Sequence, residues 1–99
     1  MTTPACHRIP PGVEFQRWHG GDEWVLYHSG TGETLRLSEA AVAVIDLLEQ
    51  AGPMERDALA DALNALMDTP LPPAEISVAL GDLLRILISH ECVEPVACA

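Results

Sequence analysis

Apolar and polar positions alternate in two short runs, at residues 13–18 and 34–37, and between them residues 24–28 form a run with two largely apolar faces, as expected for the middle strand of a small sheet covered by helices. Alternation with a period of two is typical of half-buried strands. Glycine-containing turns at residues 19–23 and 29–32 separate the runs. In the third run the two leucines point one way, while the threonine and the arginine point the other, so one face is expected to be buried. The pattern predicts a three-stranded antiparallel sheet.

After Ser38 the apolar residues recur at helical spacing. Ser38 is a good N-cap, and Gly52 followed by proline ends a helix in the usual way. Further helices are expected at about residues 54–67 and 73–90, the second of them started by paired prolines. The segment 92–95 either adds a short terminal strand or simply extends. Three helices therefore follow the sheet.

The chain has the length and composition of one domain. It has 99 residues, of which 48% are hydrophobic and four are aromatic, so the core is expected to consist of leucine, valine, isoleucine and alanine. Residues 1–12 contain three prolines and are expected to form an irregular lead-in, with the folded domain at residues 13–95. The predicted fold class is α+β, a three-stranded antiparallel sheet followed by three α-helices.

The net charge of the chain is −10, from five basic and fifteen acidic residues. A protein that binds duplex DNA needs a basic surface to displace counterions from phosphates, so a nucleic-acid partner is not expected. Anionic membrane surfaces are disfavoured for the same reason, and no apolar run approaches the ~20 residues that span a bilayer. The charge favours partners with basic segments, or it serves only to keep a small protein soluble.

The three cysteines, Cys6, Cys92 and Cys98, lie near the two ends of the chain. An odd number in these positions is a poor disulfide framework and fits a reducing cytoplasm. The first residues lack a charged segment followed by an apolar one, so secretion is not indicated. We therefore expect a cytoplasmic protein.

Motifs for catalysis and metal binding are weak in this sequence. The pair Gly30-Thr-Gly32 lacks the Gly-Lys-Ser/Thr continuation of a phosphate loop and leads into a strand, so it is expected to form a hairpin turn. No serine has the Gly-x-Ser-x-Gly context of an activated nucleophile. The pairs Cys6-His7 and His90-Glu-Cys92 are poor zinc motifs. We expect no catalytic residue, metal or cofactor.

The order of the elements leaves the last strand of the sheet with a free edge. Unpaired N–H and C=O groups on such an edge can accept a peptide as an additional strand, so a peptide-binding module is favoured over an enzyme. A free edge can also pair with a second copy, which leaves a homodimer open. Trp18 and Trp24 are expected to pack under a helix rather than to line a groove.

Five segments of the chain together carry a family resemblance: Trp18, Val25-Leu-Tyr27, Ser29-Gly-Thr-Gly-Glu-Thr34, Leu37-Ser-Glu-Ala-Ala41 and Cys92-Val-Glu-Pro95. With these residues the chain resembles the PqqD-like family, and within it the subgroup named for the HPr-rel-A system, over about residues 9–96. The resemblance implies a winged-helix-like fold of three strands and three helices, known as the RiPP recognition element.

The same resemblance implies a non-catalytic peptide chaperone. In this family the leader segment of a precursor peptide adds as a strand to the third strand, in a groove closed by the third helix, and is presented to a modifying enzyme. That enzyme is of the radical-SAM type or, in this subgroup, a kinase-related protein, and Arg36 would pair with an acidic leader side chain. The implied peptide-binding residues are Glu33, Thr34, Leu35, Arg36, Leu37, Leu80, Leu83, Leu84 and Leu87.

Two alternatives remain open at this point. A winged helix-turn-helix transcription regulator would have a similar fold, but the segment 73–90 carries only Arg85, beside Glu75 and Asp82, where a recognition helix requires several basic residues. The second alternative is a structural subunit that docks on a kinase-related partner without a peptide ligand.

Overall fold

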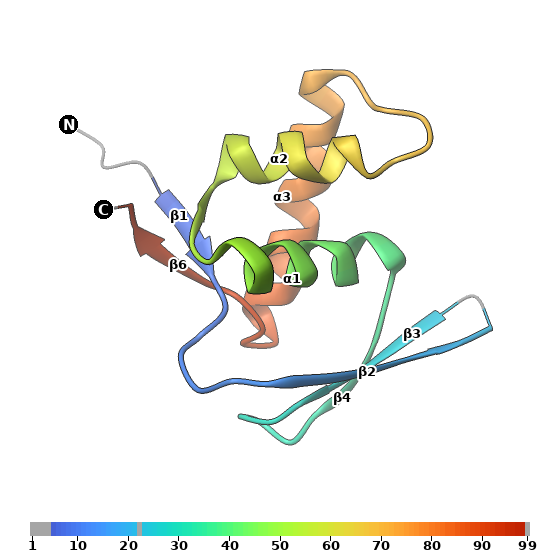
Figure 1. Ribbon diagram of the computed structural model, residues 1–99, viewed down its shortest axis with the longest axis vertical. Coiled ribbons are helices and arrows are strands. Elements are labelled where there is room, and N and C mark those ends of the chain that lie inside the picture. Colours follow the sequence, from blue (N-terminus) through green and yellow to red (C-terminus); the bar gives the residue numbers. More distant parts are fainter. Residues whose placement is uncertain (1–4, 22, 99) are drawn as a thin grey trace.

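The computed structural model describes residues 5–21 and 23–98, which form two small antiparallel sheets and three helices (Figure 1). The predicted α+β class and the three-stranded sheet ahead of three helices are confirmed. Within these residues, no helix combines the length and the apolar character that are needed to cross a bilayer. The elements in chain order are β1 (Ala5–Arg8), β2 (Phe15–Gly20), β3 (Glu23–His28), β4 (Thr34–Leu37), α1 (Glu39–Ala51), β5 (Met54–Glu55), α2 (Arg56–Ala65), α3 (Pro73–Ser89) and β6 (Glu94–Ala97).

The predicted sheet is built from β2, β3 and β4, with β3 in the centre. Leu26 of β3 lies opposite Leu35 of β4 and is completely buried. Leu37 is also buried, and Leu35 packs against the core, so this face of β4 is turned toward the helices. Thr34 and Arg36 lie on the opposite face and are exposed. The predicted division of β4 into a buried and a wet face is confirmed.

Helix α1 begins and ends where its local signals predict. The Ser38 hydroxyl accepts a hydrogen bond from the Ala41 N–H at 3.2 Å and so caps the first turn. Gly52 ends the helix with a φ of 77°, a conformation that glycine adopts without strain, and its N–H bonds to the Leu48 carbonyl. Helix α3 also lies within one residue of its predicted range. Helix α2 starts later than expected, because Met54–Glu55 form β5 instead.

The second sheet, in the order β5-β1-β6, was missed in the sequence. The expectation of an irregular lead-in is wrong for residues 5–8, which pair with both β5 and β6, whereas residues 1–4 of that lead-in lie outside the described residues. Figure 1 shows β1 and β6 side by side. The sheet therefore joins the first and last described strands to the helical half, through β5.

This sheet also corrects the interpretation of the cysteines. Cys6 of β1 forms a disulfide with Cys98, the residue that follows β6, with their Cα atoms 5.1 Å apart, and Cys92 is a buried free thiol. The expectation that the cysteines give no disulfide framework is therefore wrong. Antiparallel pairing of the two end strands brings together residues that are 92 positions apart in the sequence, which their spacing alone does not reveal.

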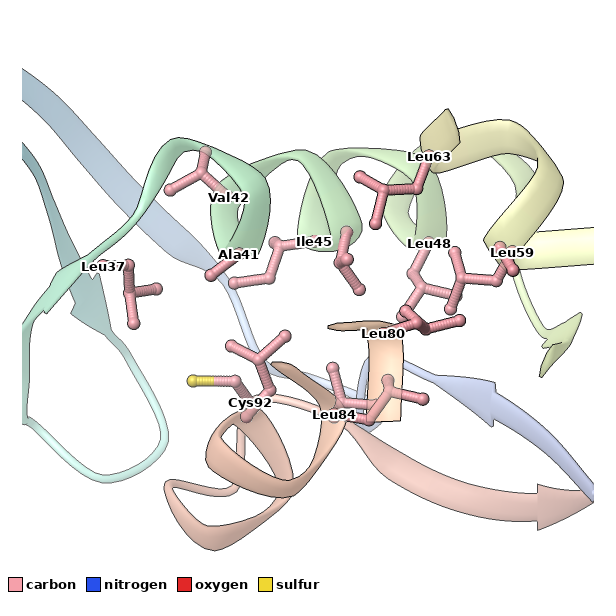
Figure 2. Close-up of a cluster of buried hydrophobic side chains, with 14 of the residues drawn as sticks. Leu37, Ala41, Val42, Ile45, Leu48, Leu59, Leu63, Leu80, Leu84 and Cys92 are labelled. Carbon is pink, nitrogen blue, oxygen red and sulfur yellow. The ribbon is translucent and has the colours of Figure 1, made fainter. Parts of the chain in front are cut away.

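The core lies between the three helices and reaches the sheet at Leu37 (Figure 2). Ile45 and Leu48 of α1 face Leu80 and Leu84 of α3 across it, and burying each such side chain contributes about 1.5–3 kcal/mol. The outer face of the β2-β3-β4 sheet carries exposed side chains, among them Trp18 and Tyr27.

The two tryptophans differ in their packing. Trp24 is half-buried, packs against the core and stacks on His19, as expected. Trp18 is 52% exposed, so the expectation that it packs under a helix is wrong. The reason is strand parity: Trp18 lies opposite Val25, on the face of the sheet that is turned away from the helices.

Candidate peptide-binding site

The free edge of β4 offers backbone groups for an additional strand. Among residues 5–21 and 23–98, β4 pairs with β3 and with no other strand. The His28 N–H donates to the Glu33 carbonyl at 2.9 Å, which makes these two residues a hydrogen-bonded antiparallel pair. Because such pairs alternate along a ladder, the two leucines of β4 bond to β3, while the N–H and C=O groups of Thr34 and Arg36 point away from it. These are the groups that a guest strand would use.

The end of α3 lies beside the start of this edge. His90, which caps the helix, is 3.2 Å from Glu33, measured from Nδ1 to Oε2. Ile86 and Leu83 precede His90 by four and seven residues, so they share its face of the helix. Ile86 is 49% exposed and Leu83 is half-buried. This face of α3 therefore presents apolar surface next to the β4 edge.

The other leucines expected in the groove are placed differently. Leu80, Leu84 and Leu87 are 0%, 3% and 0% exposed and belong to the core (Figure 2 labels the first two). These three leucines lie in the core below the candidate site. Of the four α3 leucines that were predicted, Leu83 is the one that reaches the surface. Ile86 was absent from the prediction, although an isoleucine just outside a leucine stripe is a signal for an apolar surface position.

The charged residues of the edge are open to solvent. The Arg36 side chain is 81% exposed and lies 3.9 Å from the Glu23 carboxylate on the neighbouring strand. An exposed pair of this kind contributes little stability, of the order of 1 kcal/mol or less. Arg36 is thus free to turn toward the side chain of a bound peptide.

Cys92 lies in the core behind this edge, and its chemistry is that of a buried thiol. Burial raises its pKa to about 11, and the negative charge of Glu33 adds to this effect. The thiol therefore stays protonated near neutral pH and is a poor nucleophile. Across the part of the chain that the structure describes, no three His, Cys, Asp or Glu side chains gather in an arrangement that could hold a metal ion.

A hollow of about 710 Å³ lies elsewhere, between the start of α1 and the end of α2. Its lining includes Trp24, Leu66 and Met67, and no residue of β4 or α3. It is therefore separate from the β4 edge.

Comparison with known proteins gives a consistent result. No family model matches the chain, and no curated protein matches it. The solved structure of TbiB1 in complex with the TbiA(beta) leader peptide is similar, with 27% identity and a TM-score of 0.65, over 92% of this chain and 99% of that one.

A second similar structure is the PqqD truncation of Methylobacterium extorquens PqqCD, described as a functional, stand-alone RiPP recognition element. It is 26% identical, with a TM-score of 0.66, over 90% of this chain and 88% of that one. The narrower resemblance to the HPr-rel-A subgroup stays a prediction. The resemblance to the PqqD-like family and its RiPP recognition element, which the sequence predicted, is confirmed.

Proposed function

We propose that this chain is a non-catalytic chaperone that captures the leader segment of a precursor peptide by strand addition at β4. It presents the bound peptide to a modifying enzyme of the radical-SAM or kinase-related type. The observation that supports this most is that the outward backbone groups of Thr34 and Arg36 lie on a strand with no partner on that side among the described residues, beside the apolar face of α3 that carries Ile86. The similar structures, one of which holds a leader peptide, point the same way.

The edge provides affinity, and the surrounding side chains provide selectivity. Two outward residues offer up to four main-chain hydrogen bonds, each with a net contribution of about 0.5–1.5 kcal/mol. Because these bonds ignore sequence, discrimination between peptides falls to Ile86 and Leu83 as apolar contacts and to Glu33 and Arg36 as charged ones. Any acceleration of the chemistry belongs to the enzyme, because the chaperone raises the local concentration of its substrate.

A DNA-binding role finds less support. The described part of α3 carries Arg85 as its one basic residue, and Asp82 lies 3.4 Å from it in an ion pair. A helix with this charge distribution would be repelled by phosphates.

The test uses synthetic, dye-labelled peptides that correspond to the N-terminal segments of short open reading frames beside the gene. Fluorescence anisotropy is expected to show saturable binding of one of them. Arg36→Pro removes an outward N–H and leaves the bonds to β3 intact, so it should weaken binding about tenfold or more. Arg36→Gln removes only the charge and is expected to change selectivity between peptides while binding persists.

Two results would contradict the proposed function. One is the absence of saturable binding for every such peptide, and the other is an Arg36→Pro variant that binds like the wild type.

A homodimer formed through two β4 edges would compete with the peptide, so size-exclusion chromatography with and without peptide should show the dimer dissociating as peptide binds.

A further inference from the structure

His28 is a buried histidine whose protonation state is fixed by its hydrogen bonds. It ends β3 and is 1% exposed. Its Nδ1 atom receives the backbone N–H groups of Gly30 and Thr31, at 3.0 and 3.1 Å. Since both partners are donors, Nδ1 must be the unprotonated acceptor, and Nε2 carries the hydrogen that it donates to the Glu91 carbonyl at 2.8 Å. The ring is therefore a neutral imidazole of one tautomer.

This single ring joins the two segments that flank the candidate site. Gly30 and Thr31 belong to the turn that leads into β4, and Glu91 follows the end of α3. Glu91 has a φ of 59°, which for a residue other than glycine costs about 1–2 kcal/mol. That conformation closes the helix through hydrogen bonds from the N–H groups of Glu91 and Cys92 to the carbonyls of Ile88 and Leu87. It also exposes the Glu91 carbonyl to His28.

The packing around the ring leaves little freedom for another arrangement. The ring of Phe15 meets the imidazole edge to face, with centroids 5.2 Å apart. A Cβ atom on Gly30 would lie 2.9 Å from Cε1 of His28, so the turn can approach the ring this closely only with glycine at that position.

We propose that His28 is a positioning residue that fastens the peptide-accepting edge of β4 to the end of α3. The inference rests on the proposed function and deepens it. Loss of either hydrogen-bonding role would free the turn from Nδ1 or the Glu91 carbonyl from Nε2, and the ring would no longer join the two segments. Peptide binding is therefore expected to weaken when either role is removed.

Two substitutions divide the role of the ring between its two nitrogens. His28→Asn keeps an oxygen acceptor near the position of Nδ1 and loses the donor to Glu91. His28→Gln reaches toward Glu91 with an amide N–H and loses the acceptor for the turn. His19→Asn, at an exposed position of β2, is the control for a histidine outside the link.

The experiment has two readouts at neutral pH: amide exchange of Gly30 and Thr31 in the free protein, and the Kd of the labelled leader peptide. The His19→Asn control should bind like the wild type, and both His28 variants should bind about tenfold more weakly, since a buried hydrogen-bond link is lost. Protection of the Thr31 amide should fall in His28→Gln and persist in His28→Asn.

The two readouts separate this inference from the proposed function. Wild-type affinity in both His28 variants would overturn it. Unchanged protection of Gly30 and Thr31 in His28→Gln would overturn it even without a peptide. If the wild type binds no leader peptide while the exchange rates respond as described, the link through His28 is supported and the proposed function fails.

Discussion

The two edges of the β2-β3-β4 sheet differ in what surrounds them. Both leave backbone groups unpaired among the described residues. The Ser29 N–H donates to the Glu14 carbonyl at 3.0 Å, which sets the alternation of hydrogen bonds between β2 and β3. By this alternation the N–H and C=O groups of Phe15, Arg17 and His19 point outward from β2, as those of Thr34 and Arg36 do from β4. An unpaired edge alone therefore does not identify a peptide site.

The environment of the β2 edge is charged and occupied. Arg17 forms ion pairs with Asp46 and with Glu49 of α1, the second at 2.6 Å from Nη2 to Oε1. Its side chain is 21% exposed, which shows how closely α1 covers this strand. The β4 edge instead lies beside the apolar face of α3 that carries Ile86. The comparison indicates that neighbouring apolar surface, rather than free N–H groups, distinguishes a binding edge.

The largest expected effect concerns the register of β4. Leu35→Pro removes an N–H that bonds to β3, so we expect a loss of unfolding free energy of about 3 kcal/mol or more. Arg36→Pro removes an outward N–H and should cost about 1 kcal/mol or less. Urea denaturation of the two variants measures the difference. Equal losses would show that the inward and outward positions of β4 are assigned wrongly.

A proline on the opposite edge tests which edge binds the peptide. His19→Pro removes an outward N–H of β2, and it should leave the Kd of the leader peptide within about twofold of the wild type, while Arg36→Pro weakens binding about tenfold. Anisotropy titrations compare the two. Loss of binding in His19→Pro alone would move the site to β2.

Substitutions on α3 test the apolar flank with a smaller effect. Ile86→Ser should raise Kd about five- to thirtyfold, because burying an isoleucine against a peptide contributes about 1–2 kcal/mol. The side chain is 49% exposed in the free protein, so the melting temperature should change little. Val78→Ser is the matched control, because Val78 is 66% exposed and lies more than a helical turn along α3 from Leu83 and Ile86. Equal effects of the two would exclude a specific role for Ile86.

The smallest expected effect is on stability at alkaline pH and concerns Cys92, which lies in the core behind the β4 edge. The pKa of Cys92 is raised from 9.0 to about 11 by burial and by Glu33, so the unfolded chain loses this proton at lower pH than the folded one. Stability should therefore be unaffected below about pH 9 and decline as the pH rises toward about 11. Urea midpoints across this range measure the decline, which Cys92→Ala should reduce. An identical decline in that variant would assign it to other groups.

Local signals predicted the parts of the fold that depend on neighbouring residues. The Ser38 cap, the Gly52 end of α1 and the parity of β4 are all set within a few positions, and each was correct. The second sheet depends on pairing between four-residue segments at opposite ends of the chain, and neither segment has a pattern long enough to recognise. The disulfide was missed for the same reason.

The candidate site was predictable to a similar extent. The edge of β4 follows from a hairpin that precedes a helix, which is visible in the sequence. Which face of α3 lies beside that edge does not follow from the sequence. Periodicity shows that Leu80, Leu84 and Leu87 form a stripe, but it does not show which flank of that stripe is covered. Only the contact between His90 and Glu33 shows that the flank with Leu83 and Ile86 faces the edge. The strongest apolar stripe in the sequence of α3 therefore marks the buried face of the helix and not the face beside the candidate site.

Amide hydrogen exchange with and without saturating leader peptide tests strand addition at β4 most directly. Peptide should slow exchange of the Thr34 and Arg36 amides about tenfold or more and leave those of Phe15, Arg17 and His19 unchanged. Slowed exchange along β2, or a bound peptide that protects neither edge, would contradict capture of the peptide by β4.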